Sequence, residues 1–186
     1  MKKKKNGKYP LLIAIYRNNI KIVQLLLEYA NQHQIILELN EKNNTVRYPL
    51  LWAILFDNIE IVQLLIAYAN QHQIILELNE KDKNRKYPLL IATSRNNIEI
   101  VWLLLKYANQ HQIILELNEK NNTVRYPLLW AILFNNIEMV QLLIAYANQH
   151  QIILKYKKKD IEYKPEIKYL LQNYEKEIEK RKKVNK

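Results

Sequence analysis

The chain of 186 residues contains no cysteine, one glycine (Gly7) and one serine (Ser94). Without cysteine it can form neither disulfide bonds nor thiolate metal sites, and this composition is typical of a reducing compartment. One glycine cannot make a glycine-rich phosphate loop, and no histidine stands near Ser94 in the repeat register. No apolar run approaches the ~20 residues that span a membrane. We therefore expect a soluble intracellular protein, cytoplasmic or nuclear.

A Tyr-Pro pair recurs at a constant spacing of 39 residues, at positions 9, 48, 87 and 126. A fixed period of this size indicates a stacked array of small units. The copies from 48 and 126 differ, over YPLLWAIL through NQHQIIL, at two positions only, and the copies from 9 and 87 share YPLLIA, RNNI and NQHQIILELN. The order is therefore A-B-A-B. The expected repeats are 9–47, 48–86, 87–125 and 126–154.

Each copy predicts two helices joined by a tight turn. Pro49 suits the first position of a helix, where its missing N–H is not needed. The first helix should end at Asp57-Asn58, because Asp and Asn tolerate the left-handed conformation that closes a helix. The next segment, IEIVQLLIAYANQH, is apolar around most of its circumference and predicts a helix covered by neighbouring repeats. The alternating IILELN and the polar EKNNTVRY predict a short hairpin.

These residues resemble the ankyrin repeat, whose consensus has a TPLH-L-A-A opening, a Gly-His turn, an E-I-V-x-L-L-L second helix and an Asn-containing hairpin. The matching residues in the second copy are Pro49, Leu50, Ala53, Glu60, Ile61, Val62, Leu64, Leu65 and Asn79. The resemblance implies a mainly α fold, an ankyrin-type helix-turn-helix solenoid with short inter-repeat β-hairpins or loops and a C-terminal capping helix. The rival is a HEAT-like helical solenoid without hairpins; IVxLL after a two-residue turn favours ankyrin.

The chain departs from the ankyrin pattern in four respects. Tyr48 replaces the capping Thr, at a cost of about 1 kcal/mol per helix. Leu51 replaces His, Asp57-Asn58 replaces Gly-His, and the repeat has 39 residues rather than about 33. We place the extra residues in YANQHQIIL, either as a longer second helix or as a longer loop.

Beyond residue 154 the period breaks. Residues 165–171 align with 137–143 at an offset of 28, so that the first helix of a fifth repeat is expected to be missing. Residues 155–186 then form a basic linker and a C-terminal capping helix, whose charged later half supplies the polar face that a terminal repeat needs.

Positive charge is concentrated at the two ends of the chain. The basic N-terminal tail, residues 1–8, carries +5 and residues 155–186 carry +6, whereas residues 9–154 contain twelve basic and twelve acidic residues. The repeats therefore lack the basic stripe expected of a nucleic-acid-binding groove. Nucleic acid or an acidic membrane would bind only through the tails, at lysine-rich residues 2–5 and 180–183.

The chain offers no recognisable catalytic or metal-binding constellation. Its histidines occur once per repeat, at His33, His72, His111 and His150. Stacked helices lie about 8–10 Å apart, and zinc needs its nitrogens at ~2 Å, so this ladder cannot converge on a metal. We expect these side chains to hydrogen-bond to the next loop. One acid per repeat, at Glu60, Glu99 and Glu138, suits the start of the second helix.

The ankyrin resemblance implies a concave groove where partners dock, formed by the ends of the first helices and the hairpin tips. The residues at or near the helix ends are Tyr16, Arg17, Trp52, Leu55, Phe56, Ser94, Arg95, Trp130, Leu133 and Phe134, and those at the tips are Arg47, Arg85, Lys86 and Arg125. Exposed apolar groups and aromatic side chains mark interaction sites. Packing of the tryptophans inside the stack, and purely solvated tips, are the alternatives.

We therefore predict a non-catalytic ankyrin-repeat scaffold, without cofactor or metal, that binds an unknown protein or peptide, or another copy of itself, through the groove and tips. The alternative function is polyanion binding, to nucleic acid or an acidic membrane, through the lysine-rich tails.

Overall fold

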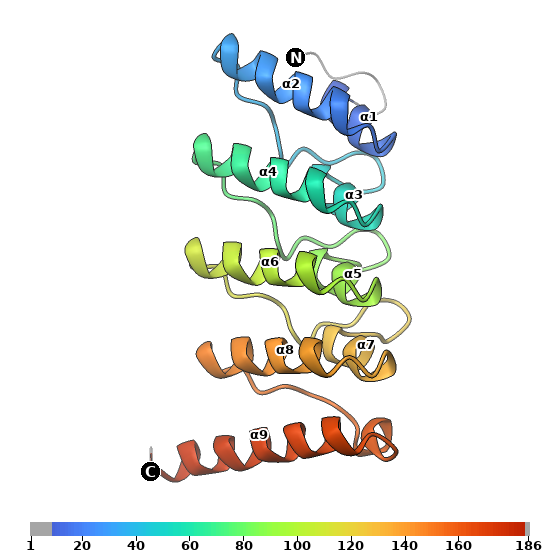
Figure 1. Cartoon of the computed structure of the whole chain (residues 1–186), viewed down its shortest axis with the longest axis vertical. Helices are drawn as coiled ribbons and strands as arrows, with labels where there is room; N and C mark the ends of the chain where they lie inside the picture. The colour runs from blue at the N-terminus through green and yellow to red at the C-terminus, as the bar shows by residue number, and fades with distance from the viewer. Residues whose placement is uncertain (1–8, 185–186) are drawn as a thin grey trace. The chain divides into compact units, whose positions relative to one another are not determined.

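A computed structural model describes residues 9–184, and the predicted tail 1–8 lies outside these residues. The chain divides into two compact units, Met1–Leu115 and Glu116–Lys186. Between residues 9 and 184 the regular structure consists of nine α-helices and one 3-10 helix, with no strand, which confirms the mainly α class (Figure 1). The predicted hairpins are loops. None of the helices in this range has the length and hydropathy needed to span a membrane.

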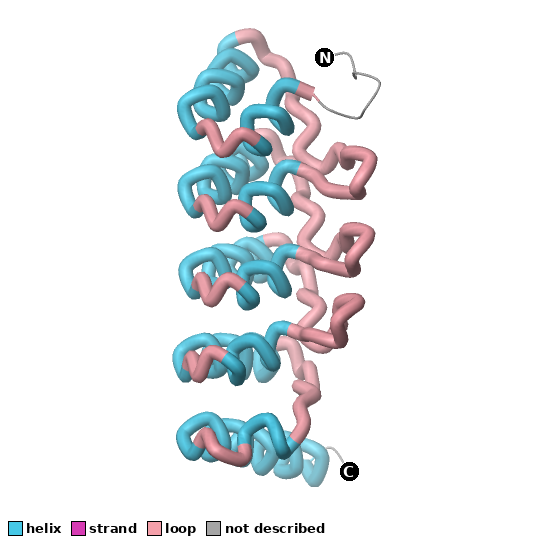
Figure 2. The backbone as a smooth tube through the Cα atoms, turned by 90° about the vertical axis from the view of Figure 1, so that its right-hand side faces the viewer, coloured by secondary structure: helices cyan, strands magenta, loops and turns pink. Residues whose placement is uncertain are grey.

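The first unit contains three helix pairs. The short first helices are α1 (Pro10–Tyr16), α3 (Pro49–Leu55) and α5 (Pro88–Ser94), and the longer second helices are α2 (Ile20–Gln32), α4 (Ile59–Gln71) and α6 (Ile98–Gln110). Helices of the same kind stack on one another, α1 on α3 on α5 and α2 on α4 on α6. This is the predicted helix-turn-helix solenoid arrangement. Loops connect each second helix to the next first helix along one side of the stack (Figure 2).

The second unit contains the fourth helix pair and the cap. Helix α7 (Pro127–Leu133) precedes α8 (Ile137–Gln149), and α9 (Pro165–Val184) packs against α8. The 3-10 helix η1 (Lys158–Ile161) packs against α7, where the first helix of a fifth repeat would lie. That helix is thus reduced to one turn rather than missing, and α9 is the predicted capping helix.

Each turn between paired helices depends on two consecutive polar residues. Asp57 adopts a left-handed conformation with φ 57°, as the sequence predicts. Asn58 then begins α4, and its side-chain oxygen accepts a hydrogen bond from the Ile61 N–H at 2.9 Å. The second residue of the pair is therefore an N-cap, a role that sequence reasoning did not assign to it. The pairs at 18–19, 96–97 and 135–136 repeat this arrangement.

The extra length of the repeat is divided between helix and loop. The YANQ segment belongs to the second helix, which in α4 ends at Gln71. Gln73 is left-handed, with φ 56°, and the N–H of Ile74 donates to the carbonyl of Ala69 at 2.8 Å. This six-to-one hydrogen bond closes the helix, and the remaining HQIIL residues lie in the loop.

The tyrosine that replaces the capping threonine binds a loop instead of capping the helix. Tyr48 makes no side-chain capping bond and is fully buried. Its hydroxyl donates to the carbonyl of Glu77 at 2.5 Å, and Tyr9 donates in the same way to Glu38 at 3.0 Å. The lost cap is offset by a side chain that fastens the loop of its own repeat to the core.

Alkaline pH should destabilise the protein through these tyrosines. Burial, reinforced by nearby carboxylates, raises the pKa of the Tyr9 and Tyr48 hydroxyls well above its usual value. The unfolded chain therefore releases these protons at lower pH, and their contribution to stability is intact below about pH 10 and lost above it. We expect a loss of about 1 kcal/mol per pH unit for each tyrosine above that pH, measured by urea unfolding.

Tyr48→Phe should make the fall in stability between about pH 10 and 11 shallower than in the wild type. Tyr163→Phe, which removes an exposed phenol, should leave the slope unchanged. Equal slopes in wild type and Tyr48→Phe would show that Tyr48 ionises as readily in the folded chain as in the unfolded one.

Candidate partner-binding surface

Three of the predicted residues form an aromatic cluster at the ends of α1 and α3. The ring centroids of Tyr16 and Trp52 lie 5.0 Å apart in an edge-to-face contact, and Phe56 stacks on Trp52 at 5.5 Å. Tyr16 also contacts Phe56 edge-to-face at 6.1 Å. Tyr16 and Phe56 are exposed, whereas Trp52 is half-buried. Mutual packing fixes these rings before any partner arrives. We call Tyr16, Trp52 and Phe56 the aromatic cluster.

A loop-tip arginine extends this cluster. The guanidinium carbon of Arg47 lies 4.7 Å from the Trp52 ring centroid, and Arg47 Nε donates to Asp82 Oδ2 at 3.1 Å. Asp82 is 5% exposed, and its other oxygen accepts from the N–H groups of Asn84 and Lys86. Asp82 therefore connects the next loop tip to Arg47 and the cluster. Sequence reasoning did not single it out.

The other predicted residues of the first unit lie at the ends of the first helices and at the loop tips. Ser94 is half-buried and donates to its own helix, at the carbonyl of Ile91. Arg95 is exposed and donates to the carbonyl of Leu55 at 2.7 Å, which links the ends of α5 and α3. The remaining predicted residues are the exposed Arg17 and Arg85 and the half-buried Leu55 and Lys86.

The second unit contains a related but smaller group. The ring centroids of Trp130 and Phe134 lie 5.8 Å apart in a stacked contact, and the guanidinium of Arg125 lies 5.4 Å from Trp130. Leu133 and Phe134 are exposed, whereas Trp130 is half-buried. The indole N–H groups of Trp52 and Trp130 are buried and form no hydrogen bond, so the indoles present ring carbon rather than a donor.

His72 and His111 hold neighbouring repeats together. Nε2 of His72 lies 2.7 Å from Asn31 Oδ1, and Nε2 of His111 lies 2.8 Å from Asn70 Oδ1. The expectation of a bond to the next loop was wrong, because the acceptor is at the end of the preceding second helix. Within residues 9–184 no three His, Asp or Glu side chains are placed to bind a metal.

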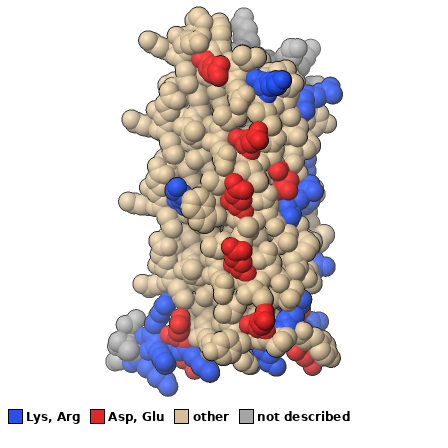
Figure 3. Space-filling view, in the orientation of Figure 1, with Lys and Arg blue, Asp and Glu red and all other residues tan. Residues whose placement is uncertain are grey.

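Charge is sparse on the face that the second helices form. In the view of Figure 3, acidic side chains are spaced along this face, and the described parts of α2, α4 and α6 carry no continuous basic stripe. Trp102, also on this face, is exposed with Lys106 Nζ at 4.8 Å from its ring. Nothing in the structure explains why tryptophan replaces glutamine there.

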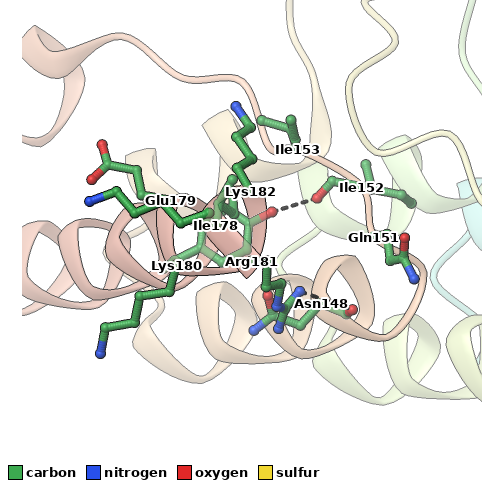
Figure 4. A pocket seen from close by; sticks show the side chains of 11 residues that line it. Asn148, Gln151, Ile152, Ile153, Ile178, Glu179, Lys180, Arg181 and Lys182 are labelled. Carbon is green, nitrogen blue, oxygen red and sulfur yellow. Dashed lines mark hydrogen bonds between the residues drawn. The ribbon is translucent and has the colours of Figure 1, made fainter. Parts of the chain in front are cut away.

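An open cavity of about 970 Å³ lies between the end of α8, the loop after it and the last turns of α9 (Figure 4). Its floor is apolar, with Ile152 and Ile178, and its rim carries the predicted basic residues 180–183. Arg181 Nη1 lies 3.4 Å from the carbonyl of Asn148. The lysines of residues 2–5 lie outside the described residues.

Comparison with known proteins agrees with this architecture. The family model for ankyrin repeats in three copies matches residues 1–75 and 66–155. The crystal structure of an ankyrin repeat domain from Acinetobacter baumannii matches with a TM-score of 0.68 and 20% sequence identity, over 93% of this chain and 84% of that one. At this identity the likeness concerns the fold. No curated protein matches the chain in sequence. On the family match, which spans most of its length, the chain belongs to the ankyrin repeat family.

Proposed function

We propose that the chain is a non-catalytic scaffold that binds a protein segment through the aromatic cluster and the adjoining loop tips, with Trp130, Leu133 and Phe134 as a second contact. Ankyrin repeats generally mediate protein interactions. The observation that carries the proposal is that Tyr16 and Phe56 are exposed although both pack on Trp52.

The packing of the cluster favours binding energetically. Rings that already contact one another lose little conformational entropy when a partner covers them. The Arg47 guanidinium is likewise held, by Trp52 on one side and Asp82 on the other. Its charge is partly matched within the chain, so that the surface offers mainly apolar area. A partner with an apolar or aromatic anchor flanked by polar groups fits it best.

Removing the exposed rings should abolish most of the affinity. The probe is a set of peptides selected from a random library for binding to the full chain. We expect Tyr16→Ala/Phe56→Ala to weaken their binding about 30-fold or more, because truncating even one central aromatic residue costs about 2 kcal/mol or more. Isothermal titration measures the affinity, and circular dichroism checks that the variant is folded.

The matched control is Trp102→Ala, which removes an exposed aromatic ring from α6 on a different face. It should leave the affinity unchanged. Loss of binding in the control but not in the double variant would refute the proposed surface. Binding that survives the double variant, disappears at high salt and requires Lys180 to Lys183 would instead support the polyanion alternative.

A further inference from the structure

We propose that copies of the chain associate head to tail, with the first repeat of one copy replacing α9 on the fourth repeat of another. The first observation is that the first repeat exposes what the later repeats bury. Ile22 and Tyr29 on α2 are 47% and 54% exposed, whereas Ile61 and Tyr68, at the same positions of α4, are 0% and 3% exposed. We call this surface of the first repeat the leading face.

The junction between the second and third repeats shows what covers a leading face. Tyr107 Oη donates to the carbonyl of Ile74 at 3.0 Å and accepts from the N–H of Leu76 at 3.2 Å. Three further contacts join the same repeats: Arg95 to the Leu55 carbonyl, Asn97 Nδ2 to Asp57 Oδ1, and His111 Nε2 to Asn70 Oδ1. The third repeat, which is of the A type, thus presents four polar groups to the B-type repeat before it.

The first repeat is also of the A type and retains all four groups. They are Arg17, Asn19, Tyr29 and His33, and each is exposed. The fourth repeat is of the B type and retains the four acceptors, which are the carbonyls of Leu133 and Ile152 and the side-chain oxygens of Asn135 and Asn148. We call this second surface the trailing face. The two faces are therefore matched in type and in spacing.

Helix α9 covers the trailing face only in part. Tyr174 Oη takes the tyrosine position, donating to the carbonyl of Ile152 and accepting from the N–H of Leu154. Ile178 stands where the repeats have histidine, and Asn148 Oδ1 is buried without a hydrogen-bond partner. A buried unpaired acceptor of this kind is costly.

The cap also fills less space than a repeat. It offers the single turn η1 in place of a full first helix. Open cavities of about 970 and 410 Å³ lie along the α8–α9 seam. A second copy would supply α1 in place of the single turn η1, and His33 for the unpaired Asn148 oxygen. Because the two joined surfaces differ, a dimer still presents one face of each kind, and further copies can add at either end unless a ring closes.

Charge sets the conditions for this association. The leading face follows a tail of net charge +5, and the trailing face precedes a segment of net charge +6. Like charges repel across the junction and are screened by salt. We therefore expect the association to strengthen between low and moderate ionic strength, the reverse of what an ion-paired interface shows.

Cross-linking tests the register directly, because the natural chain has no cysteine. Full-length His33→Cys and Asn148→Cys variants are mixed and treated with a short bis-maleimide. We expect a 33–148 dimer in about tenfold or greater excess over the product of His33→Cys with Glu138→Cys, whose cysteine is exposed in the first turn of α8 and lines neither cavity; such a ratio corresponds to about 1.4 kcal/mol. Leu171→Ala, which loosens α9, should raise the yield.

An intrachain pair supplies the positive control. Asn70→Cys/His111→Cys in one chain joins the same positions across the second and third repeats, and it should cross-link fully. If it does and the 33–148 product stays at the level of the 33–138 product, the proposal is wrong. A dimer joined 33–33 in its place would also overturn it, because leading faces would then meet each other.

Sedimentation velocity provides a second, unmodified measurement. The average mass of the wild type should rise with protein concentration and with salt, whereas Ile22→Lys should stay monomeric. Ile22 is exposed in the single chain, so this variant keeps its fold. Monomers at every concentration in both proteins would overturn head-to-tail association, and equal self-association of both would do the same.

Discussion

Ile61→Ala is expected to lower the free energy of unfolding by about 3 kcal/mol, whereas Ile22→Ala lowers it by less than about 1 kcal/mol. The two residues occupy the same position in adjacent repeats and lose the same atoms. Ile61 is fully buried where α4 meets the preceding repeat, and Ile22 is 47% exposed on α2. The difference therefore measures the burial that the preceding repeat provides, because truncation leaves a cavity only at the covered position.

Urea unfolding at low protein concentration, followed by circular dichroism at 222 nm, measures both changes. Ile100→Ala is the matched replicate, since Ile100 is as buried on α6 as Ile61 is on α4. An equal loss at Ile22 and Ile61 would contradict the exposure of the leading face. Repeating the Ile22→Ala measurement at high protein concentration tests association independently. If a second copy covers Ile22 there, Ile22→Ala should lower the free energy of unfolding by more than it does at low concentration.

The helices and turns were predictable because they depend on local chemistry. Pro49 opens α3 and Asp57 adopts the left-handed turn, as predicted, since proline and aspartate have the same backbone preferences in any context. The stacking was predictable for a related reason. The second helix is apolar around most of its circumference, so other parts of the protein must cover it. Because the repeats follow one another at a constant period, the neighbouring repeats are the segments that can cover it.

Contacts between distant residues were harder to predict. Sequence reasoning treated Tyr48 as a poor cap and assigned the histidines to the following loop. In the structure the Tyr48 hydroxyl donates a hydrogen bond to the Glu77 carbonyl, and His72 Nε2 contacts Asn31, 41 residues earlier. The first contact depends on how a loop folds back on its own repeat, and the second depends on how one repeat sits on another. The sequence period reveals neither. The reduction of a helix to the turn η1 escaped prediction because residues 158–161 have no counterpart in the repeats.

In the candidate surface, too, the positions of residues along the helices were predictable and their contacts with distant residues were not. Tyr16, Trp52 and Phe56 could be chosen from their positions at the ends of the first helices. That the three rings would contact one another could not be predicted, because this depends on the spacing of α1 and α3. Asp82 was overlooked because one aspartate in a polar loop is an ordinary turn residue. Two of its hydrogen bonds are to Asn84 and Lys86 in its own loop, and its bond to Arg47 becomes visible only when the preceding loop is in place.

Asp82→Ala should cost about 3 kcal/mol, because it leaves three donors without their acceptor: two backbone N–H groups and the Nε of Arg47. Asp82→Asn should cost about 1 kcal/mol or less. Asn43 already performs the same role in the preceding loop, where its Oδ1 accepts from the N–H groups of Thr45 and Arg47 at 2.9 and 3.0 Å. The amide keeps the loop acceptor and weakens only the contact with Arg47.

Urea unfolding measures both costs, and limited trypsin digestion reports on the loop itself. In Asp82→Ala we expect faster cleavage after Lys83 and Arg85, because the tip is no longer held, and near-wild-type cleavage in Asp82→Asn. If Asn costs as much stability as Ala while its tip stays protected, the charge pairing with Arg47, rather than the loop geometry, is the larger contribution. If Ala costs less than about 1 kcal/mol, the carboxylate does not hold the tip, and the link from this loop through Arg47 to the aromatic cluster is broken.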